Sequence, residues 1–157
     1  IEQSQIMRSI VLMRHGQAVA YQSLDAERIL TTHGRKEVLS TSAQLLHRDV
    51  RPDLMICSNY QRAIESCTIA ADVFGYKTPL LHDKMFTPEA DPILAMDYLR
   101  SLSQRCVWVV CHMPIVSLLL EGLTIDSVRW AFPTAGAVHL ISDGQSFRVM
   151  EQFVPKF

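Results

Sequence analysis

The sequence has no long apolar run, no secretory leader pattern and no excess of charge. No apolar segment approaches the roughly 18 residues that a membrane-spanning helix requires, and no basic segment followed by an apolar stretch indicates export. The formal net charge is −1, so the chain as a whole attracts neither nucleic acid nor an anionic membrane. These absences favour a cytoplasmic protein. They also mean that any affinity for anions must come from a local cluster of basic side chains.

Paired cysteines and metal-ligand spacings are also missing. The cysteines show no CxxC pair, and the nearest two stand at the ends of the apolar segment 106–111, too far apart in a strand for a disulfide. We therefore expect free, mostly buried thiols at Cys57, Cys67, Cys106 and Cys111. Four histidines have no spacing typical of a metal site and are expected to be surface or structural residues: His33, His47, His82 and His139. We expect neither a metal nor a cofactor.

The composition that remains is that of one ordinary globular domain. Hydrophobic residues make up 48% of the 157 residues and charged residues 20%, which indicates a packed core rather than disorder. No repeat, low-complexity tract or linker-like stretch divides the chain. We expect residues 9–157 to form a single domain and residues 1–8 to be a flexible N-terminal segment or a remnant of cloning.

Strand and helix patterns alternate along this domain. Short apolar runs predict strands at residues 10–13, 54–57, 80–81 and 107–111. Helices are expected to begin after Thr31, near Tyr60 (ending at Gly75), at Asp91-Pro92 and at Pro114. One face of the first helix is expected to carry Val38, Leu39, Ser42, Leu45 and Leu46. Segments 137–142 and 147–153 flank Asp143-Gly144 and predict an antiparallel hairpin. This order predicts a three-layer α/β/α fold with a mostly parallel, mixed central sheet.

Polar residues of catalytic type follow three of these strands. Arg14-His15 follows the first strand, Ser58 the second and His112 the fourth, while Arg62 lies in the opening turn of the helix after Ser58. Ligands bind at the carboxyl ends of the strands in an open α/β sheet, so these segments should meet at one edge. Two arginines, two histidines, a hydroxyl and two helix N-termini suit a compact dianion, most plausibly a phosphoryl group.

These residue types predict a phosphoryl transfer through a histidine. A neutral His15 has one ring nitrogen free to attack phosphorus and form a phosphohistidine. Arg14 and Arg62 can hold the non-bridging oxygens, and their charges oppose protonation of His15. His112 is expected to act as a further donor to those oxygens. Water would then release phosphate, and the arginines would take the role that a metal ion has elsewhere.

The sequence at this point resembles the histidine phosphatase superfamily, also called the phosphoglycerate mutase-like proteins. The resemblance rests on Arg14-His15-Gly16, on Leu30-Thr31-Thr32-His33-Gly34, on Ser58-Asn59-Tyr60-Gln61-Arg62-Ala63 and on His112, and it extends from about residue 9 to residue 153. The short chain, without room for an inserted cap, is most similar to the bacterial SixA subgroup of phosphohistidine phosphatases. The family implies His15 as nucleophile and Arg14, Arg62 and His112 as phosphate ligands; the subgroup adds Arg28.

Two positions depart from the family pattern. Larger members carry a glutamate general acid before the third helix, and Glu89 matches that position only loosely. Cys111 stands where many relatives have a small hydroxyl residue or glycine, which raises the question of sensitivity to oxidation. A weak general acid favours phosphohistidine, because its leaving nitrogen can already be protonated, whereas an ester oxygen benefits from a proton donor.

The leading hypothesis is therefore a metal-independent phosphoric monoester or phosphoramidate hydrolase. Its expected substrate is phosphohistidine on a partner protein, and its product is inorganic phosphate. A phosphatase of small phosphorylated metabolites is the alternative within the same superfamily. A protein that binds phosphate or acts as a scaffold without turnover is a further alternative, which the intact basic and histidine residues disfavour. A mutase would need a second basic cluster, and the sequence shows none.

Overall fold

The structure is a computed structural model that describes residues 7–21, 23–142, 144 and 146–157. Of the expected flexible segment 1–8, residues 1–6 lie outside the described residues, and Arg8 already belongs to the first strand. Asp143 of the expected hairpin turn also lies outside them. Among the described residues, no helix has the length and apolar character needed to cross a membrane.

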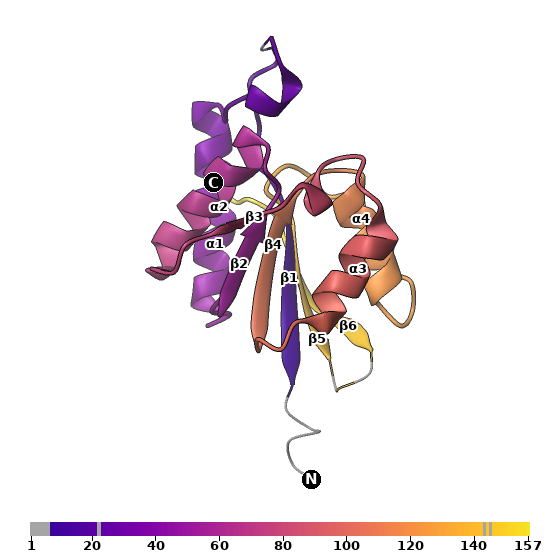
Figure 1. The fold of residues 1–157 in the computed structure, drawn as a ribbon. Coiled ribbons are helices and arrows are strands. Elements are labelled where there is room, and N and C mark those ends of the chain that lie inside the picture. The colour runs from indigo at the N-terminus through magenta and orange to yellow at the C-terminus, as the bar shows by residue number, and fades with distance from the viewer. Residues whose placement is uncertain (1–6, 22, 143, 145) are drawn as a thin grey trace.

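Helices and strands alternate until the final hairpin (Figure 1). The six strands are β1 (Arg8–Arg14), β2 (Leu54–Cys57), β3 (Leu81–His82), β4 (Cys106–Cys111), β5 (Ala137–Ser142) and β6 (Phe147–Phe153). The helices are α1 (Thr32–His47), α2 (Gln61–Phe74), α3 (Pro92–Ser101) and α4 (Ile115–Leu123), with short 3-10 turns η2 (Asp25–Glu27) and η3 (Lys84–Phe86).

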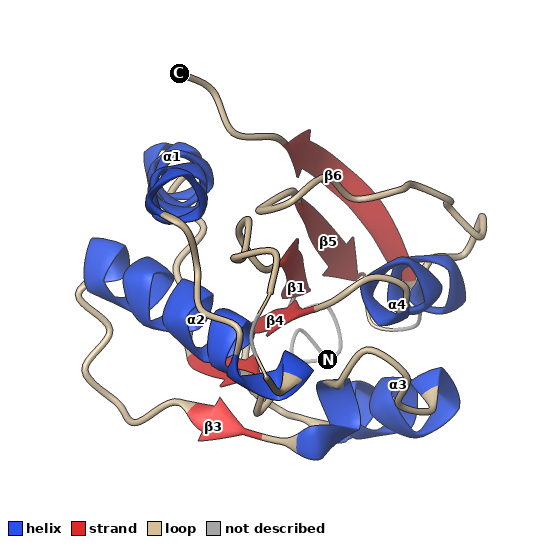
Figure 2. Cartoon of the chain, turned by 90° about the horizontal axis from the view of Figure 1, so that it is seen from above, coloured by secondary structure: helices blue, strands red, loops and turns tan. Residues whose placement is uncertain are grey.

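The strands form one mixed sheet in the order β3-β2-β4-β1-β5-β6. The β3–β2, β2–β4 and β4–β1 pairs are parallel, whereas the β1–β5 and β5–β6 pairs are antiparallel. Helices α1 and α2 cover one face and α3 and α4 cover the other (Figure 2). The predicted three-layer α/β/α class is confirmed, including the antiparallel hairpin at the edge.

Burial on both faces explains why the central strands are apolar without interruption. In β1, Ile10 and Leu12 join the core cluster under α3 and α4, whereas Val11 and Met13 join the cluster under α1 and α2. Alternate side chains of a strand point to opposite faces, so a strand covered on both sides needs apolar residues at every position. Trp108 of β4 is fully buried in the second cluster.

The helix boundaries largely follow the expected capping residues. The Thr31 hydroxyl accepts a hydrogen bond from the Gly34 N–H at 2.9 Å, and the Asp91 carboxylate accepts one from the Ile93 N–H at 2.9 Å. Gly75 ends α2 with φ of 65°. Pro114 stands at the residue just before α4, so that helix begins one position later than a proline in its first turn would imply.

Two of the expected positions are wrong in detail. Leu39 is 48% exposed, because the buried face of α1 is built from smaller and partly polar residues: Gly34, Glu37, Val38, Thr41, Ser42 and Leu45. Val38, Ser42 and Leu45 lie on that face as expected. The short strand lies at Leu81–His82, one residue later than expected.

The four cysteines are free and buried, as expected. Burial raises the pKa of the Cys111 thiol to about 12. The thiolate is the form that reacts with oxidants, and this thiol stays protonated and without access to solvent. The burial of Cys111 therefore argues against the sensitivity to oxidation that its sequence position suggested.

Two glycines let the loop after β1 pack against the start of α1. A Cβ atom at Gly16 would lie 2.5 Å from the carbonyl oxygen of Gly34, and a Cβ atom at Gly34 would overlap the backbone of Gln17. Backbone atoms cannot move aside as a flexible side chain can.

Gly34→Ala is therefore expected to lower the free energy of unfolding by about 2 kcal/mol, measured by urea denaturation. Gly75→Ala is no substitute for this test because that glycine has a positive φ; an unchanged midpoint for Gly34→Ala would contradict the prediction.

Candidate active site

The carboxyl ends of β1, β2 and β4 meet at one edge of the sheet, where the segments that follow them carry Arg14-His15, Ser58 and His112. The ring centroids of His15 and His112 lie 5.0 Å apart. Arg62, in the first turn of α2, reaches the same place, and its Nε lies 3.3 Å from Nε2 of His15. The structure thus brings together residues that are up to 98 positions apart in sequence, from Arg14 to His112 (112 minus 14).

His15 is held in one tautomer by its own loop. Its Nδ1 lies 2.7 Å from the carbonyl oxygen of Gly16. A carbonyl oxygen only accepts hydrogen bonds, so Nδ1 carries the proton and Nε2 has a free lone pair. That Nε2 accepts a hydrogen bond from Nε–H of Arg62. The amide of Gly16 is anchored in turn, because it donates to the Ser66 hydroxyl at 3.0 Å.

The surroundings of both histidines favour their neutral forms. Burial, followed by the charges of Arg62, Arg14 and Arg28, lowers the pKa of His15 from 6.5 to about 4, although the bond to Gly16 works in the opposite direction. Burial, followed by His15 and Arg62, lowers the pKa of His112 to about 2. His15 is therefore uncharged at neutral pH, with a proton on Nδ1 and none on Nε2, which is the form in which a histidine can act as a nucleophile.

Arg62 is the most connected side chain of the site and is only 5% exposed. Besides donating to His15, it donates from Nη1 to the backbone carbonyl of Asp25 at 2.8 Å and from Nη2 to the Asp25 carboxylate at 3.2 Å. Its guanidinium also lies over the ring of Tyr60, 5.1 Å from the centroid. Tyr60 in turn meets His112 edge to face, with centroids 5.1 Å apart.

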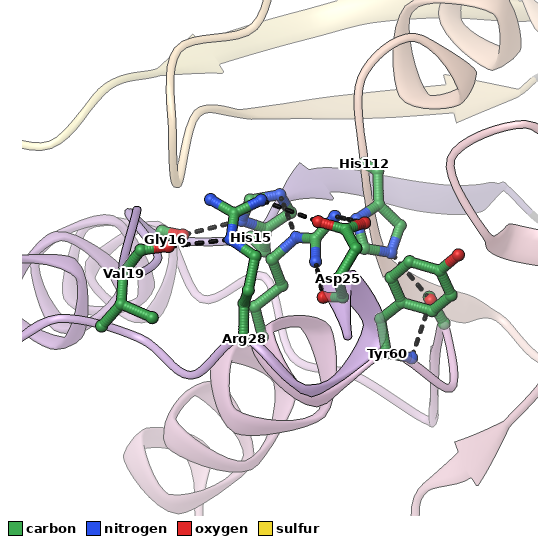
Figure 3. Close-up of polar contacts among 9 residues, drawn as sticks. His15, Gly16, Val19, Asp25, Arg28, Tyr60 and His112 are labelled. Atoms are coloured by element: carbon green, nitrogen blue, oxygen red, sulfur yellow. Dashed lines mark hydrogen bonds and ion pairs between the residues drawn. The ribbon is translucent and has the colours of Figure 1, made fainter. Parts of the chain in front are cut away.

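Arg28 lies on the opposite side of the Asp25 carboxylate (Figure 3). Its Nη1 donates to Oδ1 of Asp25 at 2.9 Å, and its Nε donates to the carbonyl of Val19 at 2.8 Å. The carboxylate thus bridges Arg28 and Arg62. Hydrogen bonds and charge from these arginines lower the pKa of Asp25, against a smaller opposing effect of burial.

Two further predicted residues occupy fixed positions. Arg14 donates from Nη1 to the carbonyl of Phe132 at 2.8 Å. Its Nε is buried and has no hydrogen-bond partner among the described residues; the same is true of Nδ1 of His112. Ser58 is fully buried, and its hydroxyl bonds to Nε2 of His112 at 2.8 Å and accepts from the Tyr60 amide at 3.1 Å.

Glu89 lies apart from this group. It is exposed and lines a cavity of about 670 Å³ between η2 and the start of α3, a cavity that Asp25 and Tyr60 also line. Sequence reasoning did not select Asp25 or Tyr60. The only available signals were the spacing of Asp25 three residues before Arg28, typical of an ion pair, and the place of Tyr60 inside the Ser58–Arg62 motif.

Within the part of the chain that the structure describes, no cluster of three or more His, Cys, Asp or Glu side chains could hold a metal.

Acid is expected to destabilise the fold through the two buried histidines. In the unfolded chain each has the ordinary pKa of 6.5, whereas in the folded protein the pKa is about 4 for His15 and about 2 for His112. As the pH falls below 6.5, the unfolded chain binds protons that the folded protein does not. The free energy of unfolding should therefore fall by about 1 kcal/mol per pH unit for each histidine.

This pH dependence can be measured by urea unfolding at about pH 7 and about pH 5. In His15→Asn the loss of stability between the two should be smaller than in the wild type by about 2 kcal/mol, since one of the two histidines is gone. His82→Asn, at an exposed position, should leave the loss unchanged. Equal losses in the wild type and in His15→Asn would contradict the assignment of a low pKa to His15.

Known proteins share both the sequence pattern and the fold. The model of the histidine phosphatase superfamily (branch 1) matches residues 10–86. The phosphohistidine phosphatase SixA of Escherichia coli (strain K12) is 26% identical over 137 residues, which cover 85% of this chain and 85% of that protein.

Solved structures agree with this at the level of the fold. A structure of the protein histidine phosphatase SixA complexed with tungstate has a TM-score of 0.89 and 24% identity, covering 94% of this chain and 97% of that chain. A mycobacterial glucosyl-3-phosphoglycerate phosphatase has a TM-score of 0.67 and 15% identity, covering 95% and 100%. The motif-bearing residues, the matching family model and the shared fold agree: the chain is similar to the histidine phosphatase superfamily and to SixA, and this similarity indicates a hydrolase of the phosphatase type.

Proposed function

We propose that this phosphatase removes the phosphoryl group from phosphohistidine on a partner protein, through a phosphohistidine intermediate on its own His15. The observation that carries the proposal is the state of the His15 ring. Nδ1–H is fixed on the Gly16 carbonyl at 2.7 Å, and the unprotonated Nε2 accepts a hydrogen bond from Nε–H of Arg62 at 3.3 Å. A nucleophilic lone pair beside a cation that can bind phosphoryl oxygens is the arrangement that this reaction requires.

The phosphoryl oxygens would be held by the basic groups around His15. Arg62 and Arg28 offer the Nη groups that now pair with Asp25, and Arg14 offers a buried Nε without a partner among the described residues. Buried Nδ1 of His112, which also has no partner among the described residues, would donate to another oxygen. We assign Ser58 to the orientation of His112, because its hydroxyl bonds to the far nitrogen of that ring.

The first transfer forms one bond and breaks one. Nε2 of His15 bonds to phosphorus while the bond from phosphorus to the substrate nitrogen breaks, and the electron pair of that bond goes to the substrate ring. The arginines stabilise the charge that spreads over the phosphoryl oxygens in the transition state. Water then attacks the phosphorus of the intermediate, and the bond from phosphorus to Nε2 breaks and returns its electron pair to that nitrogen. Inorganic phosphate leaves with the oxygen of the water, whose proton passes to the phosphate or to solvent, and His15 is again neutral with its proton on Nδ1.

Neither Asp25 nor Glu89 is suited to donate a proton to a leaving group. Asp25 is held ionised by two arginines, and Glu89 is exposed and lies on the adjoining cavity rather than against His15. A departing alkoxide needs a proton, whereas the nitrogen of a protonated phosphohistidine does not. The Escherichia coli relative SixA, which this chain resembles, is named a phosphohistidine phosphatase.

The test compares substrates under conditions that remove free divalent metals. The protein is incubated in EDTA with a phosphohistidine-bearing carrier protein, p-nitrophenyl phosphate and a panel of sugar phosphates, and the phosphoenzyme is trapped in alkali and mapped by mass spectrometry. We expect phosphate on His15 and the highest kcat/KM with the carrier protein. Higher kcat/KM for an ester would favour the metabolite phosphatase instead. Phosphate binding without turnover of any substrate would favour the non-catalytic alternative, and a requirement for metal would contradict the mechanism.

A further inference from the structure

Asp25 stands at the boundary between the proposed phosphate pocket and the adjoining cavity. On one side its carboxylate pairs with Arg62 at 3.2 Å and with Arg28 at 2.9 Å. On the other side it lines the cavity of about 670 Å³. Its side chain is 58% exposed, so it is available to a substrate. It is the carboxylate that bonds to the arginines which we assign to the phosphoryl group.

A leaving group would occupy this boundary. Once Nε2 of His15 attacks phosphorus, the bond that breaks points away from His15, toward solvent and the mouth of the pocket. The cavity at that mouth is acidic: besides Asp25 it is lined by Asp83, Glu89 and Asp91, with Lys84 as the one basic residue among its lining residues. Asp83 and Asp91 accept hydrogen bonds from the backbone amides of Met85 and Ile93, which fix these carboxylates in place.

We propose that Asp25 is a specificity-determining residue that selects substrates whose leaving group carries a positive charge. The inference rests on the proposed function and adds a reason for its substrate class. Asp25 would lie against the protonated ring of a phosphohistidine, or the ammonium group of another phosphoramidate. The chemistry is that of an N-phosphorylated base, in contrast to that of a phosphate ester.

The electron balance of the transfer supports this selection. When the bond between phosphorus and a protonated imidazole breaks, its electron pair converts the cationic ring to neutral imidazole, so no proton has to arrive. A carboxylate beside the ring stabilises the protonated, reactive form. For an ester the same electron pair produces an alkoxide, which an ionised carboxylate repels and cannot protonate. Asp25 therefore favours the phosphoramidate and disfavours the ester.

Asp25 has a second effect, which is independent of the leaving group. Its carboxylate now satisfies Nη groups of Arg28 and Arg62 that a phosphoryl group would use. An incoming oxyanion must replace the carboxylate in at least one of these two hydrogen bonds. Removing the negative charge of Asp25 should therefore strengthen the binding of a bare oxyanion, whereas a residue that merely supports the arginines would weaken it when replaced.

The test uses Asp25→Asn, with Glu27→Gln as a matched control. Glu27 lies on the same 3-10 turn, and its exposed side chain has no polar contact among the described residues. For each protein, kcat/KM is measured with a phosphohistidine-bearing carrier protein and with p-nitrophenyl phosphate, and inorganic phosphate is titrated as a competitive inhibitor. Thermal unfolding reports whether the variants are folded.

We expect Asp25→Asn to lower the ratio of kcat/KM for phosphohistidine to that for p-nitrophenyl phosphate by about fivefold, the size of an effect at a partly exposed charge. Inorganic phosphate should inhibit this variant at lower concentration, and Glu27→Gln should match the wild type in both respects. A proportional fall with both substrates, together with weaker inhibition by phosphate, would overturn the inference and leave Asp25 as a support for the arginines. A wild type without His15-dependent hydrolysis of phosphohistidine would instead refute the proposed function, and this inference with it.

Discussion

Replacement of His15 by asparagine is expected to abolish turnover and to leave the fold intact. The amide nitrogen of asparagine can take the place of Nδ1 and donate to the Gly16 carbonyl, a bond of 2.7 Å in the wild type. No atom of asparagine replaces Nε2, so the nucleophile alone is removed. Loss of a catalytic nucleophile lowers kcat by about 10,000-fold or more. The variant should also form no alkali-stable phosphoenzyme.

The measurement combines single-turnover kinetics with binding of inorganic phosphate by calorimetry. The arginines remain in His15→Asn, so it should still bind phosphate, which separates a missing nucleophile from a collapsed pocket. His82→Asn makes the same substitution at an exposed position and should retain wild-type kinetics. Residual turnover above about one hundredth of the wild-type rate would assign the nucleophile to another residue.

Replacement of Arg62 by lysine is expected to lower kcat/KM by about 100-fold to 1,000-fold, the range for loss of a donor that stabilises the transition state. Arg62 bonds to three acceptors at once: Nε2 of His15 and both the carbonyl and the carboxylate of Asp25. The fork of a guanidinium can bridge the nucleophile and a phosphoryl oxygen. A single ammonium group cannot do both, although the charge is conserved.

How the loss of activity in Arg62→Lys divides between kcat and KM is as informative as the size of that loss. Because the proposed contact strengthens in the transition state, most of the loss in Arg62→Lys should appear in kcat, with a smaller increase in KM. Arg35→Lys provides the control, since Arg35 is exposed and its side-chain ion pair is with Glu65 at 3.9 Å, outside the site. A loss of less than about tenfold, or one confined to KM, would reduce Arg62 to a ground-state binding residue.

Local sequence signals determined most of the secondary structure. Thr31 and Asp91 cap their helices, Gly75 ends α2, and the hairpin strands lie at the expected residues. Capping and turn formation depend on atoms within a few residues, so a single sequence contains the needed information. Leu39 shows the limit of this reasoning. Its exposure follows from how α1 packs against the rest of the molecule, not from its own hydrophobicity.

The sequence was less informative about side chains that share a site without sharing a motif. Arg14-His15, Ser58, Arg62 and His112 were expected together because each follows or adjoins a strand end. Asp25 was not expected, because its η2 turn lies in the connection between β1 and α1. Its spacing of three residues from Arg28 indicates an ion pair but does not place it beside Arg62. Its contact with Arg62 spans 37 residues and exists only in the folded chain.

The sequence by itself determined the α/β class, the order of the elements, the capping residues and the set of basic and histidine residues at the strand ends. The tertiary structure decided the strand order β3-β2-β4-β1-β5-β6, the single tautomer of His15 and the place of Asp25 between two arginines. The physical reason is the distance along the chain over which each kind of interaction acts. Periodicity, caps and turns act over a few residues, whereas strand neighbours, burial and the electrostatic field at a site depend on packing between segments that are distant in the chain.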